Sequence, residues 1–353
     1  MKLTKTLTLV VLICLAFALM VACTPAAATT TAGTTTAAAT TATTGAQTGS
    51  NYDIFLGIIQ PGPEFYYQQL TDAMTLAAEY AGMDVTSLIS EYSAEKELAN
   101  VEDLISQGAE AIIMFSVSGD SAQIAAQLCN EADIPFFTVG GTASAGPGVV
   151  TSSIKNDFAE MGEMGGAWLA ENFEGEAKIA DIQGLLGADI AEAISRGFAK
   201  GLGSRADMEV VFTTPADWDR AKAIAITEDL LASDLDFNII FVHNEDMCAG
   251  VITVLQEAGV LNNGVQVLSQ NGSPDGFKFI REGSLLMTVS NSSTYVGGDA
   301  IVQIMKYLDG KTVEPIWNAP VFPIDASNVD DPNQVTWDMS WATQRVDEYL
   351  AAK

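Results

Sequence analysis

The chain has 353 residues, of which 48% are hydrophobic and 17% charged, and its formal net charge is −29. This length and apolar content allow two domains with real cores. The acidic balance repels phosphate backbones, so it argues against nucleic-acid binding. Cys129 and Cys248 lie far apart inside predicted helices, without metal-ligand spacing, and are expected to be buried free thiols.

The N-terminal segment predicts export. Lys2 and Lys5 precede an apolar run over 7–22 that is too short for a comfortable transmembrane helix. The run ends in LMVAC at 19–23, which resembles a bacterial lipobox. We therefore expect a signal peptide over 1–22 and a lipidated Cys23. The alternative is an ordinary signal peptide with an incidental cysteine.

Residues 24–50 are almost only Ala and Thr, with a few glycines. A segment without large apolar side chains cannot build a core. Together with the anchor, residues 23–50 are therefore expected to be a flexible linker between the lipid and a folded domain. Such a stalk could carry glycans, although nothing in the sequence indicates it.

Apolar runs then alternate with segments of helical periodicity. The first series has strands over 54–59, 85–89, 111–115 and 135–139, with helices between them, the second of which is expected to stop at Gly108. After a Gly/Ser/Thr-rich stretch over 140–153 the alternation resumes, with strands over 178–183, 210–213, 238–242, 265–269 and 285–289. This order predicts an α/β fold of two doubly wound parallel sheets, whose ligands sit at the carboxyl ends of strands.

Several segments resemble the type I periplasmic sugar-binding proteins, the family of the ribose-binding protein. The similarity runs from about residue 52 to residue 320, and its motifs taken together are specific for the family. They are EKELANVEDLI at 95–105, ADIP at 132–135, PADWDR at 215–220, NEDM at 244–247 and NGSPDG at 271–276. The resemblance implies a periplasmic binding protein type I fold, in which two lobes close over a ligand.

The family also implies a three-strand hinge, with crossings placed by position near Lys155, Asn291 and Pro320. The expected lobes are 51–154 plus 292–320 for the first and 155–291 plus 321–353 for the second. The tail after residue 322 runs longer than the family core. Trp337 and Trp341 are expected to dock it on the second lobe.

Ligand-binding positions follow from the same resemblance. Aromatic planes bury the flat CH faces of sugar rings, and asparagine offers both donors and an acceptor. The aromatic candidates are Phe65 and Tyr66, in a loop after the first strand, and Trp218 on the opposite lobe; the amide candidates are Asn244, Asn271 and Asn291. The alternatives are core packing for each aromatic residue and a turn or helix cap for each asparagine.

The departures from the family pattern bear on the ligand. Gly140 and Gly141 stand where sugar binders of the family usually carry an Asp-Arg pair, and Asn271 replaces an acidic contact. An arginine of the family is also missing from the helix after Gly184. Because these charged ligand contacts are absent, we expect a bulkier neutral ligand, either a sugar or sugar-like molecule or a nucleoside.

An enzymatic role is not expected. The only histidine, His243, lies beside Asn244 at a strand end and is taken as a pocket or structural residue. One histidine, no clustered cysteines and no Gly-x-Ser-x-Gly motif leave no nucleophile with a base, and no metal or cofactor is expected. Repressors that share the two-lobe core need a DNA-binding domain, which a signal peptide replaces here.

The sequence therefore predicts the solute-binding component of an ABC importer, lipid-anchored on the extracytoplasmic side of the cell membrane. Its expected partners are a small sugar-like molecule, held by hinge closure, and an ABC permease. The protein itself is expected to be a monomer. The alternative is a receptor component for chemotaxis or signalling, which reuses the same kind of binder.

Overall fold

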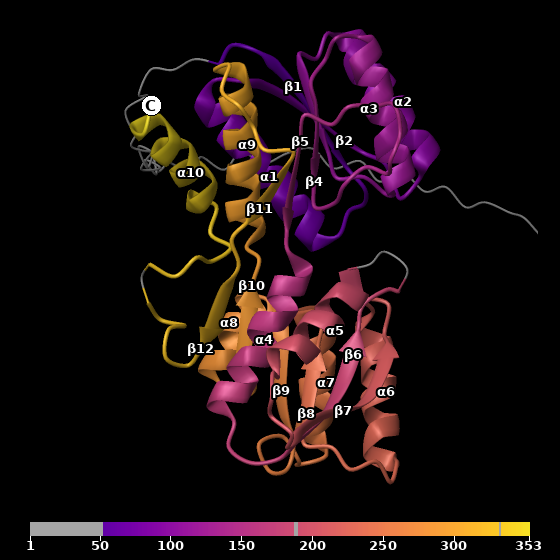
Figure 1. Ribbon diagram of the computed structural model, residues 1–353, viewed down its shortest axis with the longest axis vertical. Helices are drawn as coiled ribbons and strands as arrows, with labels where there is room; N and C mark the ends of the chain where they lie inside the picture. Colours follow the sequence, from indigo (N-terminus) through magenta and orange to yellow (C-terminus); the bar gives the residue numbers. More distant parts are fainter. Residues whose placement is uncertain (1–51, 187–189, 332) are drawn as a thin grey trace, which may run out of the picture. The chain divides into compact units, whose positions relative to one another are not determined.

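The computed structural model describes residues 52–186, 190–331 and 333–353. The predicted signal peptide, Cys23 and the Ala/Thr linker lie outside these residues. The described chain builds two six-stranded sheets, each flanked by helices (Figure 1). The prediction of an α/β fold with two doubly wound sheets is confirmed.

The first sheet is parallel throughout and has the strand order β11-β5-β4-β3-β1-β2. Its strands are β1 (Phe55–Gln60), β2 (Asp84–Ile89), β3 (Ala111–Met114), β4 (Phe136–Val139), β5 (Ser152–Asn156) and β11 (Ile316–Ala319). Its helices are α1 (Phe65–Ala81), α2 (Ala94–Gln107), α3 (Gly119–Glu131) and α9 (Ser293–Leu308), which packs on α1.

The second sheet has the order β12-β10-β9-β8-β6-β7, with β12 antiparallel to β10 and the other pairs parallel. Its strands are β6 (Ala177–Gln183), β7 (Met208–Pro215), β8 (Ile239–Val242), β9 (Gln266–Asn271), β10 (Met287–Ser290) and β12 (Phe322–Asp325). Its helices are α4 (Phe158–Asn172), α5 (Ile190–Gly201), α6 (Arg220–Ala232), α7 (Glu245–Glu257) and α8 (Pro274–Arg281).

Both faces of each sheet are covered. In β1, Ile58 belongs to the apolar cluster under α1 and α9, while Ile59 belongs to the cluster under α2 and α3, and both are fully buried. Burial on two faces is why β1 is a continuous apolar run rather than an alternating one. As predicted, Gly108 ends α2 with φ +91, a conformation that glycine adopts without a Cβ clash.

Glycines bring α4 and α5 into backbone contact in the second lobe. A Cβ atom on Gly162 would stand 2.0 Å from the carbonyl oxygen of Ile194, and one on Gly197 would stand 2.0 Å from that of Ala159. Only residues without a side chain allow helices to approach so closely. This contact fixes α5 against α4.

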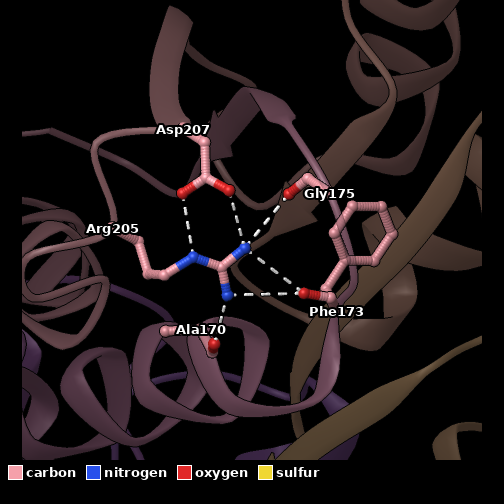
Figure 2. Close-up of polar contacts among 5 residues, drawn as sticks. All are labelled: Ala170, Phe173, Gly175, Arg205 and Asp207. Atoms are coloured by element: carbon pink, nitrogen blue, oxygen red, sulfur yellow. Dashed lines mark hydrogen bonds and ion pairs between the residues drawn. The ribbon is translucent and has the colours of Figure 1, made fainter.

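Arg205 holds the end of α4 and the connection that follows it (Figure 2). Its guanidinium donates hydrogen bonds to the carbonyl oxygens of Ala170, Phe173 and Gly175 and pairs with the Asp207 carboxylate at 2.8 Å. The carbonyls at a helix C-terminus lack partners within the helix, so a cation there is favourable. The hydrogen bonds from Arg205 hold the pKa of the Asp207 carboxyl below its ordinary value.

Several connections lead from one sheet to the other. Strand β5 of the first sheet is followed by α4, which packs on α5 and β10 of the second. Strand β10 of the second sheet is followed by α9, which packs on α1. Between β11 and β12, residues 320–321 join the two sheets again.

The C-terminal segment differs from the expectation that placed 321–353 on the second lobe. Strand β12 belongs to the second sheet, but α10 (Ser340–Ala351) packs on α1 and α9. Ala342 and Val346 lie in the apolar cluster of the first sheet, because α10 buries its apolar face there. Trp341 lies 6.0 Å from Tyr295 of α9, so it docks the tail on the first lobe.

Within the described ranges, none of the helices is both long and apolar enough to cross a bilayer. Cys129 and Cys248 are buried and free, as predicted. Burial raises the pKa of the Cys129 thiol to about 12, so the thiol stays neutral and acts as a packing group.

Candidate functional site

The carboxyl ends of parallel strands gather several of the predicted residues at one edge of the second sheet. Strands β6, β8 and β9 run parallel, and Gly184, His243 and Asn271 lie at or directly after their ends. Asn291 follows the end of β10, and its backbone N–H donates to the Asn271 carbonyl oxygen at 3.2 Å. Such an edge is where open α/β sheets bind ligands.

Trp218 lies in the loop between β7 and α6, as predicted. Asp217 and Trp218 have φ values of +54 and +62, a left-handed conformation that is uncommon outside glycine. The indole lies against Gly184, where an added Cβ would stand 2.1 Å from the ring. It also packs on both apolar clusters of the second lobe and remains half-buried. The indole therefore takes part in core packing, the structural alternative, and is still partly exposed to solvent.

His243 is buried, with a relative exposure of 1%. Its Nδ1 accepts the Gly184 N–H at 3.3 Å, which places the ring proton on Nε2, 2.9 Å from Oδ1 of Asp181. Ser195 donates to the other oxygen of Asp181 at 2.5 Å and receives a hydrogen bond from Gln183 at 2.7 Å. Because both ring nitrogens are engaged within the lobe, the structural alternative for His243 is favoured, with the ring in a supporting position behind Gly184 and Trp218.

Asn244 acts as a helix cap. Its Oδ1 accepts the Met247 N–H at 2.8 Å at the start of α7, which was the structural alternative for this residue. The same side chain is half-buried and keeps an amide NH₂ that this cap does not use. Capping and ligand contact can therefore share one residue.

Asn271 has a strained backbone. Its φ of +123 lies in a region that L side chains rarely adopt. Such outliers cost about 1–3 kcal/mol each and cluster at ligand sites. The loop after it is held from below by Glu245, whose carboxylate accepts the N–H groups of Gly272 and Ser273 at 2.8 and 2.6 Å.

Glu245 also accepts the Thr288 hydroxyl at 2.6 Å and is 2% exposed. Burial raises the pKa of its carboxyl to about 7, although the hydrogen bonds from Ser273 and Thr288 favour the ionised form. Sequence reasoning missed this residue. An acidic side chain at the first position of a helix fits the helix dipole, so its position carried no signal of a role in the neighbouring loop.

Asn291 is 5% exposed, and its Oδ1 has no hydrogen-bond partner in the described part of the chain. Buried polar atoms are almost always satisfied, so an orphan acceptor at a strand end is a candidate for a ligand or a water. This observation favours the ligand-contact alternative for Asn291 over the structural one.

The first lobe presents its aromatic residues differently from the expectation. Phe65 and Tyr66 are the first residues of α1, so the prediction that they lie in a loop was wrong. Phe65 is 64% exposed, whereas Tyr66 is half-buried and packs on the apolar cluster under α1. Burial raises the pKa of Tyr66.

Gly140 makes room for an aromatic ring. It follows β4 with φ +77, and an added Cβ would stand 2.1 Å from the Phe115 ring. Phe115 in turn lies edge-on to Tyr67 with ring centroids 4.8 Å apart, and Tyr67 contacts Tyr92. Gly141 is exposed, and a Cβ there would meet nothing within 4 Å.

Aromatic side chains thus stand beside Gly140. Sequence reasoning missed Tyr67, Tyr92 and Phe115, although aromatics next to strand ends are a detectable signal. Within the ranges that the structure describes, no three His, Cys, Asp or Glu side chains come together as a metal site.

Residues 57–312 match the model of the periplasmic binding protein domain, which is most of the chain. The chain belongs to this family. Its two wound sheets agree with this membership, and the resemblance drawn from the sequence motifs is confirmed.

Relatives of this periplasmic binding protein include the ribose import binding protein of Escherichia coli (strain K12). It is 29% identical over 249 residues, which cover 70% of this chain and 82% of the relative. The galactofuranose-binding protein of the same organism is 23% identical over 260 residues, covering 71% and 81%.

A similar solved structure is an ABC transporter periplasmic solute binding protein from Actinobacillus succinogenes 130z with bound D-allose. It has a TM-score of 0.73 at 20% identity, covering 79% of this chain and all of that one. A solute binding protein from Bacillus halodurans C-125 with bound myo-inositol has a TM-score of 0.71 at 23% identity, covering 80% and 98%. At these identities the likeness shows the fold.

Proposed function

We propose that this periplasmic binding protein is the solute-binding component of an ABC importer and takes a small, neutral, ring-shaped polar molecule, a sugar or sugar-like compound, between its two lobes. The observation that carries the proposal is the pair Trp218 and Asn271. Both are non-glycine residues held at positive φ at the carboxyl edge of one sheet. Strain of this kind is kept where a side chain must point in a set direction.

The chemistry of the candidate residues supports a neutral ligand. An indole covers a flat CH face, while the amides of Asn244, Asn271 and Asn291 serve hydroxyls as donors and acceptors. Gly140 and Gly141 bring no charged side chain to the first lobe. The names of the relatives and the sugar or polyol in the solved structures agree with this class of ligand.

Hinge closure is the proposed mechanism. The first lobe would comprise 51–154 plus 292–320 together with α10, and the second 155–291 plus the segment through β12. Connections that run between the sheets would act as the hinge, and the ligand would stabilise the closed form by touching both lobes. The permease would then recognise the closed pair of lobes.

We place the protein on the extracytoplasmic side of the membrane, tethered through lipid on Cys23. This rests on the lipobox-like LMVAC segment and the Ala/Thr linker that follows it. The folded body is proposed to work as a monomer, since one chain supplies both walls of the site.

A thermal-shift screen of the full mature chain against pentoses, hexoses, myo-inositol and nucleosides tests the proposal. A ligand at a hundred times its dissociation constant should add about 2.7 kcal/mol to the free energy of unfolding. A shift with a sugar or cyclitol supports the proposal. A shift with nucleosides alone would move the ligand class to nucleosides, to which the Asn271 amide and the aromatics are also suited. No shift with any compound would contradict it.

A further inference from the structure

The C-terminal segment reaches the candidate site through one side chain, Trp337. This residue lies 25 positions beyond the end of the matched family domain at residue 312. Its indole is 6% exposed and is stacked on Phe65, with ring centroids 5.9 Å apart and an interplanar angle of 17°. It also meets Tyr66 edge-on at 5.7 Å.

The same indole reaches the second lobe. Its Nε1–H donates to the carbonyl oxygen of Asn271 at 3.1 Å, and this oxygen also accepts the N–H of Asn291. One side chain therefore contacts an aromatic candidate on the first lobe and the backbone of an amide candidate on the second. Trp337 was expected to dock the tail on the second lobe. It does contact Asn271 there, but it also stacks on Phe65 of the first lobe.

The backbone around Trp337 is fixed rather than loosely laid on the surface. Gln69 of α1 donates to the Trp337 carbonyl oxygen at 3.2 Å, and Ser292 donates to the Thr336 carbonyl oxygen at 2.7 Å. Thr294 adds a second, longer bond to that oxygen at 3.3 Å. The segment is thus tied to α1 and to the start of α9.

The result for Phe65 is an asymmetric environment. One face of the phenyl ring is covered by the indole of Trp337, yet the side chain as a whole stays 64% exposed. A ring backed on one side and open on the other is held ready for a second stacking partner. For Asn271, the indole N–H helps to hold the carbonyl of a residue with φ +123.

We infer that Trp337 is a positioning residue of the ligand site: it sets the orientation of Phe65 and of the Asn271 backbone together, so that the C-terminal segment takes part in recognising a flat ring. This inference rests on the proposed function for its ligand, but the positioning itself exists without ligand. The proposed ligand class and the positioning role of Trp337 can therefore be disproved separately.

Isothermal titration calorimetry with D-ribose, D-allose and myo-inositol as probes tests the effect on binding. Trp337→Leu removes the stack and the donor, and should weaken binding of the probe that the wild type takes by about tenfold or more. Trp337→Phe keeps a ring against Phe65 and should lose less. Trp341→Leu is the matched control on the same segment, since Trp341 contacts Tyr295 instead, and should stay within about twofold.

A double-mutant cycle with Phe65→Leu separates positioning from a general loss of structure. If Trp337 acts through Phe65, the double variant should bind far more tightly than the product of the two single losses predicts. Losses that multiply, or wild-type affinity in Trp337→Leu, would overturn the inference.

Hydrogen exchange of the ligand-free protein tests the positioning even if none of the probes binds. Peptides that include the amides of Gly272 and Asn291 should exchange about tenfold faster in Trp337→Leu than in the wild type or Trp341→Leu. If none of the probes binds the wild type, the proposed sugar ligand fails and this exchange result alone decides on Trp337. Should Trp337→Leu not fold, exchange of the Asn291 amide is measured in Trp337→Phe, which also lacks the indole donor. Unchanged exchange in the folded variants would overturn the inference.

Discussion

The indole of Trp218 lies directly against Gly184: a Cβ atom on Gly184 would stand 2.1 Å from Cζ2 and Cη2 of the ring. No Cβ tolerates such an approach, so any side chain at 184 must displace the indole. Since Gly184 also donates its N–H to His243, the glycine lies between the buried Asp181–His243 pair and the Trp218 indole. The orientation of Trp218 can therefore be tested by a substitution at Gly184, with the tryptophan itself unchanged.

Gly184→Ala should tilt the Trp218 ring and weaken ligand binding by about tenfold or more, because stacking depends on the plane of the ring. Near-ultraviolet circular dichroism of the ligand-free protein should change as the indole moves. Gly141→Ala serves as the control for ligand-free structure, since a Cβ there meets nothing within 4 Å. An unchanged spectrum with unchanged affinity would show that Trp218 does not depend on Gly184.

Trp218→Ala should reduce affinity by a hundredfold or more, a loss on the order of 2–4 kcal/mol from the buried area and face contact. Trp218→Phe should recover most of it. The half-buried ring also packs on the second lobe, so we expect Trp218→Ala to lose stability as well, on the order of 1 kcal/mol. A large drop in melting temperature with unchanged affinity of the folded fraction would remove Trp218 from the site.

The buried carboxyl of Glu245 should make stability depend on pH. Its pKa rises from 4.5 to about 7 on burial, because the folded state favours the neutral carboxyl. Its contribution to the free energy of unfolding is therefore fully present below about pH 4.5 and is lost as the pH rises through 7. The loss is on the order of 3 kcal/mol. Urea unfolding between pH 5 and 8 should show a free energy of unfolding that falls with rising pH in the wild type. The fall should be smaller in Glu245→Gln. Glu257→Gln, an exposed change on the same helix, should keep the wild-type slope. Equal slopes for all three proteins would refute the assignment.

The helix contact between α4 and α5 should be intolerant of a single methyl group. Gly162→Ala would place a Cβ 2.0 Å from the Ile194 carbonyl oxygen and force the helices apart, at a cost of about 1–3 kcal/mol. Gly165→Ala lies on the same helix, and its Cβ would find the nearest atom at 3.6 Å, so it should be tolerated. Chemical denaturation measures both. Equal stability of the two variants would speak against this packing.

Cys23 gives a prediction for the segment outside the described residues. Cys23→Ser should release the protein from the membrane fraction into the medium, since the leader would lose its lipidation site. Fractionation of cells that express either form measures it. Wild-type protein that is already soluble and begins at another residue would contradict the anchor.

The wound sheets could be predicted because their strands are buried on both faces and leave continuous apolar runs, as residues 54–59 do. The loops that carry Trp218 and Asn271 were found through motifs of the family. The position of α10 could not be predicted, because its amphipathic pattern fits either lobe. Contacts made in the folded chain, such as the pairing of Arg345 with Asp299 and the burial of Val346, place it on the first.

Contacts between distant residues were the other limit. Nothing in the sequence indicates that Trp337 stacks on Phe65 or that Phe115 fills the space left by Gly140, because both contacts arise only when the chain is folded. His243 looked like a pocket residue because it stands at a strand end. Its burial against Asp181 depends on β6 and α5, which lie far away in sequence.

The proposed ligand bridges the two lobes and closes them. Small-angle X-ray scattering of the mature protein, with and without the compound that stabilises it in the thermal screen, tests this most directly. We expect a smaller radius of gyration at saturating ligand, because the closed form brings the lobes together. An unchanged radius of gyration with a confirmed, saturating ligand would contradict it.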